Sequence, residues 1–465
     1  MLDFKKTKLI CTYGPALEKF LMLNLSDKEI NLSSQTKANF STLCNSGCNV
    51  IRFNMSHDEM KNHELRFNYF RQLSNETNSN LGLLIDTKGP EIRLGKIDLK
   101  NNLVKKDDVL LLNTLDYDIL GNNKQIAVTD ITHTYNLAND LIVGDKILID
   151  DGKLILKVLT IDTKAGIIKT VSLTDQYCLL PNKRINLFNK RYSLPFLSDY
   201  DVLTIKNAVL WKADFLALSF ISNLKQLTEV KKIINQTDPN SKIKIICKIE
   251  TPEALDNIHE LINNSDGIMV ARGDLSLEIG YEHVPLAQDK ILELCQQQNK
   301  ISIIATQMLD SLQNAILPTR AEVTDCYYAV KSGVDSTMLS GESASSLDPI
   351  NAIQVMNKIV TNTEKNLLAK NCFSNNYYFL DKNLKKVIKK IFYNSSGFKN
   401  VLLKKFSEQE LRVISNSILE KNFFIIGSDY DQSTTFTLYK NLFIIKDVEE
   451  LKEITNNNFS IAEKK

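Results

Sequence analysis

The sequence predicts an α/β protein built on a parallel (β/α)8 TIM barrel, with a β-rich domain inserted after the third strand and a small α/β domain at the C-terminus. Three observations predict this fold class. Apolar runs of strand length alternate with helix-like segments over most of the 465 residues. Between about residues 94 and 183 the pattern changes to short runs separated by turns. Polar clusters follow most of the apolar runs, as expected where barrel strands end at a functional site.

The chain length suggests about three domains, and the change in pattern gives their expected bounds. Residues 1–91 and 186–360 are predicted to form the barrel, 92–185 the inserted domain and 361–465 a divergent C-terminal domain.

The first part of the barrel is predicted to hold three strands, each an apolar run that ends in a turn signal or in polar residues. A polar stretch from about Leu17 to Gln35 predicts a helix with an extra loop. The strands are expected at Lys8–Gly14, Asn49–Met55 and Leu81–Lys88, and the other helices at Thr36–Asn45 and Asp58–Ser74.

The inserted domain is predicted to be a mostly antiparallel β structure, because its runs are short, alternate in polarity and are separated by Gly, Asn and Asp turns. Its clearest strands are expected at Asp108–Asn113, Lys146–Ile149, Lys153–Leu159 and Ile167–Ser172.

The β/α alternation then resumes and completes the predicted eight barrel strands. Five strands are expected, at Phe215–Ile221, Lys242–Glu250, Gly267–Leu275, Ile301–Met308 and Ser336–Ser343, with helices such as Asn223–Ile234 and Leu286–Gln298 between them. The last hundred residues carry helical stretches and short strands, which predict a small α/β domain without a Gly-rich phosphate loop. Those strands are expected at Val401–Lys404, Asn422–Ile426 and Leu442–Ile445.

The composition argues against several classes of partner. Hydrophobic residues make up 43% of the chain and the formal net charge is +2, which gives no electrostatic reason to bind nucleic acid or an anionic membrane. No apolar stretch is long enough to cross a bilayer, and the N-terminus does not read as a signal peptide. The eight cysteines lack paired zinc spacing, and Cys44 and Cys48 read as structural. A reducing, cytoplasmic location is expected.

The strand that ends in Lys248 and Glu250 carries the most informative cluster. Side chains two apart on a strand share a face, so this ammonium and this carboxylate are expected to point the same way. Thr251-Pro252-Glu253 then predicts a helix start, with a hydroxyl cap and Pro at the first helical position. A cation and an acid at the end of a buried strand suit a site for a metal and a phosphoryl group.

The next two strands are predicted to add to this cluster. Asp274 follows the sixth strand and could share one hard cation with Glu250, Mg²⁺ or Mn²⁺ rather than zinc. The alternative for each acid alone is a salt bridge inside the barrel. Gly273 frees backbone N–H groups that could hold an anionic carboxylate. Thr306 supplies a hydroxyl at the seventh strand end, although a lone threonine there is more often a core residue.

The second and third strand ends offer oxygen atoms suited to a larger monovalent cation. Arg52 lies on the same face of its strand as two of these residues. The candidate oxygens belong to Asn54, Ser56, Asp86 and Thr87.

The ordered motifs resemble those of the pyruvate kinase family. The matching blocks are Cys11–Pro15, Asn49–His57, Asp86–Arg93, the Lys248 strand, Ile268–Asp274, Ala305–Met308, Pro318–Glu322 and Met338–Glu342. The resemblance covers the predicted barrel fully, the inserted domain moderately and the C-terminal domain weakly. So many ordered blocks are far more specific than a lone motif.

The resemblance implies phosphoryl transfer from phosphoenolpyruvate to ADP, giving pyruvate and ATP. It implies that Lys248 stabilises the transferring phosphoryl group and that Arg52 contacts the substrate phosphate. Gly273, Asp274 and Thr306 would bind the substrate carboxylate, with Thr306 near the carbon that is protonated.

The resemblance also implies the cofactors and the nucleotide site. Glu250 and Asp274 would hold Mg²⁺ or Mn²⁺, and Glu91 matches the acid that accompanies dependence on K⁺. The monovalent ion would lie among Asn54, Ser56, Asp86 and Thr87, and the nucleotide phosphates would face Asn54, His57, Arg93 and Lys183. The inserted domain would act as a lid that excludes water. A homo-tetramer is expected, with a dimer as the alternative.

Three departures from the family pattern stand out. Asp58 replaces a usual Gly after His57, and the segment from Asn182 to Phe188 carries Arg184 where Gly is common. The C-terminal stretch 402–408 lacks the hydroxyl-rich turn for a sugar-phosphate activator, so the sequence does not support activation by a sugar diphosphate.

Two other classes of function remain open from the sequence. A non-catalytic interaction protein descended from the enzyme would explain the drift at Asp58, Arg184 and the C-terminal domain, but Lys248 and Glu250 are intact. A barrel aldolase or lyase acting on a metal-bound enolate would need no nucleotide, so saturable ADP binding would exclude it as the main activity.

Overall fold

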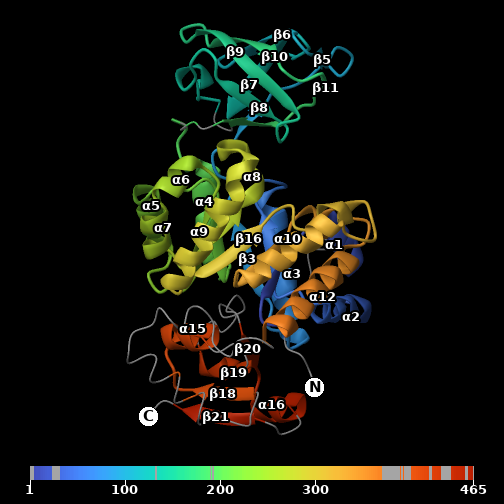
Figure 1. The fold of residues 1–465 in the computed structure, drawn as a ribbon, viewed down its shortest axis with the longest axis vertical. Helices are drawn as coiled ribbons and strands as arrows, with labels where there is room; N and C mark the ends of the chain where they lie inside the picture. Colours follow the sequence, from blue (N-terminus) through green and yellow to red (C-terminus); the bar gives the residue numbers. More distant parts are fainter. Residues whose placement is uncertain are drawn as a thin grey trace.

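Three parts follow one another along the long axis of the molecule (Figure 1). A closed barrel of eight strands lies in the middle, a second closed β barrel lies at one end, and a four-stranded sheet lies at the other. The computed structural model describes residues 5–23, 32–130, 133–188, 190, 193–368, 388, 391, 400–417, 422–430, 441–455 and 459–463. The predicted fold class, a (β/α)8 barrel with an inserted β domain and a C-terminal α/β domain, is confirmed.

The central barrel is formed by strands that all pair in parallel, in the order β1-β17-β16-β15-β14-β13-β3-β2. Nearly every residue of these strands is buried, because helices cover the outside and side chains fill the inside. The strands are β1 (Lys8–Thr12), β2 (Val50–Asn54), β3 (Gly82–Asp86), β13 (Phe215–Leu218), β14 (Lys244–Ile249), β15 (Gly267–Ala271), β16 (Ile301–Ala305) and β17 (Ser336–Leu339).

The predicted strands have the right places but run too far at their carboxyl ends. Gly267–Leu275 was expected to be one strand, whereas β15 ends at Ala271 and helix α8 begins at Arg272. The polar residues after each strand leave the sheet because they form the loops and helix starts at the mouth of the barrel.

Helices surround the barrel, and some of them begin with a side chain that caps the first turn. Ser198 and Asp201 form a capping box at the start of α4, and Thr319 and Glu322 form another at α10. Thr251 caps α6 as predicted, since its hydroxyl accepts a hydrogen bond from Ala254 N at 3.2 Å. The helices are α1 (Pro15–Leu21), α2 (Ser34–Asn45), α3 (Met60–Glu76), α4 (Asp199–Leu210), α5 (Leu224–Thr237), α6 (Pro252–Asp256), α7 (Ile258–Asn264), α8 (Arg272–Ile279), α9 (Val284–Gln297), α10 (Arg320–Lys331), α11 (Gly341–Ala344) and α12 (Pro349–Leu368), with 3-10 turns η2 (Tyr281–His283) and η3 (Asp310–Gln313).

The helix expected over Leu17–Gln35 is only partly described. Helix α1 ends at Leu21, and α2 begins at Ser34. Residues 24–31 of that prediction lie outside the described part of the chain.

The inserted domain is a closed barrel with the strand order β10-β6-β7-β4-β12-β8-β9 and a separate β5–β11 ribbon. Strands β6 and β7 pair in parallel, and the other neighbours pair antiparallel. The inserted domain is expected to end at residue 185, but strand β12 runs to Leu187. The domain bounds stay a proposal. The elements are β4 (Ile92–Leu94), β5 (Leu103–Lys105), β6 (Val109–Asn113), β7 (Gln125–Asp130), η1 (Leu137–Asn139), β8 (Lys146–Ile149), β9 (Leu154–Asp162), β10 (Ile167–Ser172), β11 (Gln176–Cys178) and β12 (Arg184–Leu187).

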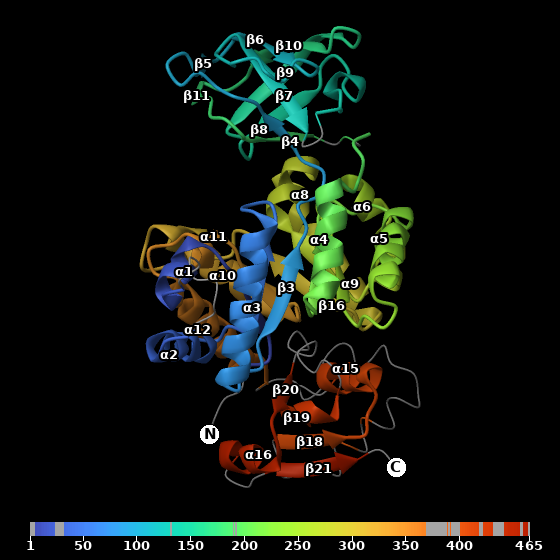
Figure 2. The same ribbon diagram turned by 180° about the vertical axis from the view of Figure 1, so that it is seen from behind.

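The C-terminal unit packs on the amino-terminal ends of the barrel strands, which leaves the carboxyl ends facing the inserted domain (Figure 2). Arg412 and Asp335 form a buried bidentate ion pair across this junction, with two N–O distances of 2.8 Å. Lys8 Nζ donates to the carbonyl of Leu442 at 2.9 Å. The elements are β18 (Asn400–Lys404), α15 (Glu408–Ser417), β19 (Asn422–Ile426), η4 (Gly427–Asp429), β20 (Leu442–Ile445), α16 (Val448–Thr455) and β21 (Phe459–Glu463), in a parallel sheet of order β20-β19-β18-β21.

Two further features concern the helices and the cysteines of the described residues. None of their helices has both the length and the apolar character needed to cross a bilayer. The cysteines that the structure describes are free thiols, and Cys48 is buried as expected for a structural residue.

Candidate active site

Four buried charges form a chain across the mouth of the barrel. Arg52 Nε lies 2.6 Å from Asp86 Oδ2, and Lys248 Nζ lies 3.2 Å from Asp86 Oδ1. Lys248 Nζ also lies 2.9 Å from Glu250 Oε1, so the two side chains share a face as predicted. Two cations and two carboxylates therefore alternate in a water-poor site where charge interactions are strong.

Burial and pairing set the protonation of this chain. Burial alone would raise the pKa of Asp86, but Lys248 and Arg52 outweigh it and hold that pKa below its usual value. Burial opposes the charge on Lys248, but Asp86 and Glu250 raise its pKa, so Lys248 keeps its proton. Burial raises the pKa of Glu250, whose charge Lys248 only partly compensates. The site thus holds a permanent ammonium and a carboxylate that favours further positive charge.

The oxygens of Glu250 and Asp274 fit a divalent cation. Glu250 Oε2 accepts from Phe220 N at 2.6 Å, while its buried Oε1 lies 2.9 Å from Lys248 Nζ. Asp274 is close enough to Glu250 to raise the pKa of that carboxyl. Among the described residues no three His, Cys, Asp or Glu gather as a metal cluster. Two carboxylates would leave the other positions to substrate or water oxygens, which suits Mg²⁺ or Mn²⁺.

Gly273 and Thr306 form a cradle at the start of α8. Gly273 N donates to Thr306 Oγ1 at 2.7 Å, and Asp274 follows in the same first turn. Thr306 and Gln307 both have positive φ, 70° and 52°. This conformation is costly for a β-branched residue, about 1–3 kcal/mol, and such strain clusters at functional sites. Arg272 holds the strained turn, because its guanidinium donates to the Thr306 carbonyl at 2.8 Å.

The residues expected to hold a monovalent ion lie at the ends of the adjacent strands β2 and β3. Asn54 and Asp86 are register partners on β2 and β3, and Asn54 Oδ1 accepts from Ser56 N at 3.2 Å. Thr87 Oγ1 accepts from Ser219 N at 3.0 Å. The Asp86 carboxylate also pairs with Arg52 and Lys248, as described above.

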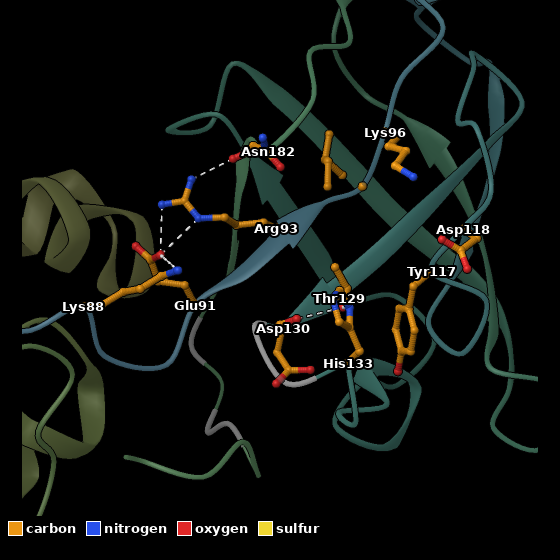
Figure 3. Close-up of a pocket in the computed structure, with 12 residues that line it drawn as sticks. Lys88, Glu91, Arg93, Lys96, Tyr117, Asp118, Thr129, Asp130, His133 and Asn182 are labelled. Atoms are coloured by element: carbon orange, nitrogen blue, oxygen red, sulfur yellow. Dashed lines mark hydrogen bonds and ion pairs between the residues drawn. The ribbon is translucent and has the colours of Figure 1, made fainter. Parts of the chain in front are cut away.

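The residues expected at the nucleotide phosphates divide into two groups. Arg93 donates to Glu91 at 2.9 Å and to the carbonyl of Asn182 at 2.7 Å (Figure 3). His57 lies near enough that Arg93, after burial, lowers its pKa. Lys183 is turned to the inserted domain, where its Nζ lies 2.7 Å from Asp150 Oδ1. The structure therefore places Arg93 and His57 near each other and pairs Lys183 with Asp150 within the inserted domain.

A cavity of about 560 Å³ opens beside Arg93, between the β3–β4 connection and the inserted domain. Lys88, Glu91 and Arg93 lie at one side of it, and Tyr117 and His133 lie at the other (Figure 3). The rings of Tyr117 and His133 pack with centroids 5.0 Å apart. Its size and mixed charged and aromatic lining suit part of a nucleotide.

Sequence reasoning missed three residues at the mouth of the barrel. Ser219 accepts from Lys248 Nζ at 2.7 Å and donates to the Thr87 carbonyl at 2.7 Å. Phe220 supplies the N–H that binds Glu250, and Arg184 pairs with Asp274 at 2.7 Å. The apolar run predicts a continuous strand over Phe215–Ile221, which includes Ser219 and Phe220, whereas β13 ends at Leu218. The parity of the strand places Ser219 on the inward face and could have identified it.

Comparison with known proteins agrees with this geometry. Residues 4–353 match the family model of the pyruvate kinase barrel domain. A pyruvate kinase of Mycoplasma genitalium is 43% identical over 371 residues, which is 78% of this chain and 72% of the relative. One from Mycoplasma pneumoniae is 42% identical over 364 residues, or 77% and 71% of the two chains.

A solved structure extends the likeness beyond the barrel. The crystal structure of a pyruvate kinase from Cryptosporidium parvum superposes with a TM-score of 0.80 at 28% sequence identity, over 98% of this chain and 90% of that one. The family match, the relatives and the shared architecture all point the same way. The chain therefore belongs to the pyruvate kinase family.

Proposed function

We propose that the chain transfers the phosphoryl group of phosphoenolpyruvate to ADP, giving pyruvate and ATP, as the last step of glycolysis. The observation that carries this proposal is the buried chain of Arg52, Asp86, Lys248 and Glu250 beside the Gly273–Thr306 cradle. In the reaction the bond between phosphorus and the enol oxygen breaks, a bond to the terminal phosphate of ADP forms, and the enolate carbon takes a proton.

The roles of the charged residues follow from their positions. Lys248 keeps its charge in a buried site, so it can compensate the negative charge on the transferring phosphoryl group without reorganising water. Arg52, held by Asp86, contacts the substrate phosphate. Because both cations are already fixed by carboxylates, little conformational entropy is lost when substrate binds.

The cradle binds the other end of phosphoenolpyruvate. The N-terminus of α8 favours the substrate carboxylate, with Asp274 N beside Gly273, whose N–H holds Thr306 Oγ1. The Thr306 hydroxyl lies beside it, and we place it near the carbon that accepts the proton. The left-handed backbone at Thr306 fixes this hydroxyl in position.

The cofactors are Mg²⁺ or Mn²⁺ together with K⁺. Glu250 and Asp274 would hold the divalent cation, which when bound neutralises and orients phosphate oxygens. Asn54, Ser56, Asp86 and Thr87 would hold K⁺, with Glu91 as the accompanying acid. Arg93, His57, Asn54 and Lys183 would contact the nucleotide phosphates, and closure of the inserted domain as a lid would exclude water.

We also propose a cytoplasmic homo-tetramer, with a dimer as the alternative. Apolar side chains on the outside of the barrel support self-association: Leu347 is 88% exposed and Ile316 is 79% exposed. Asn351 Nδ2 donates to the Ile316 carbonyl at 2.9 Å, which ties the loop carrying Ile316 to the start of α12. Light scattering tests this assembly, and a monomer at micromolar concentration would contradict it.

The activity is tested by measuring pyruvate formation from phosphoenolpyruvate and ADP with Mg²⁺, in paired buffers with K⁺ or with a large organic cation. Turnover that requires K⁺ is expected. Turnover without K⁺ would retain the reaction and remove the proposed monovalent site. No turnover, with ADP bound, would favour a non-catalytic protein, and no ADP binding would favour an aldolase or lyase.

A further inference from the structure

Arg184 carries a positive charge from the inserted domain into the mouth of the barrel. It opens strand β12, and its Nη1 lies 2.7 Å from Asp274 Oδ1. Its guanidinium carbon lies 4.5 Å from the centre of the Phe220 ring. The backbone N–H of Phe220 donates to Glu250. Arg184 is also close enough to act on the ionisation of Glu250. One guanidinium thus lies near both carboxylates that suit a divalent cation.

The same contact joins two parts of the molecule. Asp274 belongs to α8 of the central barrel, whereas Arg184 belongs to the closed barrel of the inserted domain. Arg184 stacks on Phe220 at the end of β13, so the contact combines a charge pair with a cation–π interaction. The side chains of Arg184 and Asp274 are only 19% and 20% exposed, which limits screening by water and salt.

Counting charges shows why this contact conflicts with a metal. The ion pairs described above join three carboxylates, Asp86, Glu250 and Asp274, to three cations, Arg52, Lys248 and Arg184. A divalent cation bound by Glu250 and Asp274 would add two positive charges and would need lone pairs of the carboxylate that Arg184 uses. Like charges this close repel strongly in a partly buried site.

We propose that Arg184 and the divalent cation compete for Asp274, so that Arg184 fastens the inserted domain to the barrel until the metal binds and releases it. This inference rests on the metal site of the proposed function. By reciprocity, the factor by which Arg184 weakens metal binding is the factor by which metal weakens the fastening. Arg184 is therefore a positioning residue, which couples metal binding to the freedom of the inserted domain.

The test measures the affinity of the full chain for Mn²⁺ without substrates. The electron paramagnetic resonance signal of free Mn²⁺ monitors the binding. Arg184→Gln is expected to bind Mn²⁺ about tenfold more tightly than the wild type, as for loss of a charge-assisted contact that is partly exposed. Arg184→Lys keeps the charge and is expected to stay within about threefold of the wild type. Lys157→Gln, which removes an exposed lysine from β9 of the same domain, controls for net charge and is expected to change nothing.

Small-angle X-ray scattering supplies a second readout. Metal-free Arg184→Gln is expected to give the curve of the Mg²⁺-loaded wild type, which differs from that of the metal-free wild type. Equal Mn²⁺ affinities in Arg184→Gln and the wild type would overturn the proposal. A scattering curve that changes neither when metal is added nor when Arg184 is replaced would overturn it as well. If Arg184→Gln does not fold, a fall in affinity of more than about threefold in Arg184→Lys decides against the proposal, since lysine makes the weaker contact.

Asp274→Asn separates this inference from the metal site itself. If Asp274→Asn loses Mn²⁺ binding while Arg184→Gln binds like the wild type, the metal site stands and the competition is wrong. If Asp274→Asn binds Mn²⁺ as well as the wild type does, the assigned metal site is wrong and the competition falls with it.

Discussion

Replacing Lys248 with Met removes the one ammonium that joins the two halves of the buried charge chain. Asp86 keeps Arg52 at 2.6 Å, but Glu250 keeps only the N–H of Phe220 among the hydrogen bonds of the described residues. Breaking a buried ion pair costs about 3–5 kcal/mol of stability. Burial already raises the pKa of Glu250, so this carboxyl can take up a proton when Lys248 is gone. The expected loss of stability is therefore near the lower end, about 3 kcal/mol. The turnover number should fall by about 10³-fold or more, because a preorganised charge at the reacting group is lost.

The two effects are measured separately. Steady-state pyruvate formation gives the turnover number, and urea denaturation gives the free energy of unfolding. Lys244→Met is the matched control, because Lys244 lies at the other end of β14 and pairs with Asp266 and Glu408 away from the mouth. It should leave turnover within about twofold of the wild type. A folded Lys248→Met protein that keeps more than about a tenth of wild-type turnover would refute the assigned role of Lys248.

Three further predictions concern other parts of the structure. Arg412→Ala and Asp335→Ala should each lower the free energy of unfolding by about 3 kcal/mol or more, and the double variant by less than the sum, in a urea double-mutant cycle; additive losses would contradict the buried pair. Thr306→Val should lower turnover about 100-fold while Thr306→Ser stays within about tenfold, because only Val leaves Gly273 N–H without its acceptor; equal kinetics would remove the hydroxyl from the mechanism. Burial lowers the pKa of Lys8 to about 7 from 10.5, so between these values the folded protein holds fewer protons than the unfolded chain and its stability rises with pH. The contribution of Lys8 to the slope of unfolding free energy against pH should reach at most about 1.4 kcal/mol per pH unit. In melts from pH 7 to 10, Lys8→Met should lack this contribution. Equal slopes in Lys8→Met and the wild type would contradict the burial of Lys8.

The sequence predicted the barrel because its signals are local. Each barrel strand is an apolar run followed by polar residues, and the period of two along a strand alone placed Lys248 and Glu250 on one face. The strand ends were less predictable, since Ser219 follows β13 between apolar neighbours and only its parity marks it as facing inward. In the inserted domain β4 spans only Ile92–Leu94, too short for its alternation to be recognised.

The parts of the site that could not be predicted depend on long-range placement. The pairing of Arg184 with Asp274 arises only when the inserted domain sits on the barrel, and no periodicity encodes that arrangement. The expected role of Lys183 at the nucleotide stays a prediction, and its ion pair with Asp150 could not be predicted from the sequence. The engagement of Asp86 with Arg52 and Lys248 likewise depends on three separate strands meeting at one point.

The most direct test of the account follows phosphorus itself. A ³¹P NMR time course of phosphoenolpyruvate, ADP, Mg²⁺ and K⁺ with the wild-type protein should show the phosphoenolpyruvate signal replaced by the γ-phosphate signal of ATP, without inorganic phosphate. That result would mean that the phosphoryl group passes directly between bound substrates in the water-poor site around Lys248. Release of inorganic phosphate, or an unchanged phosphoenolpyruvate signal while ADP is bound, would contradict it.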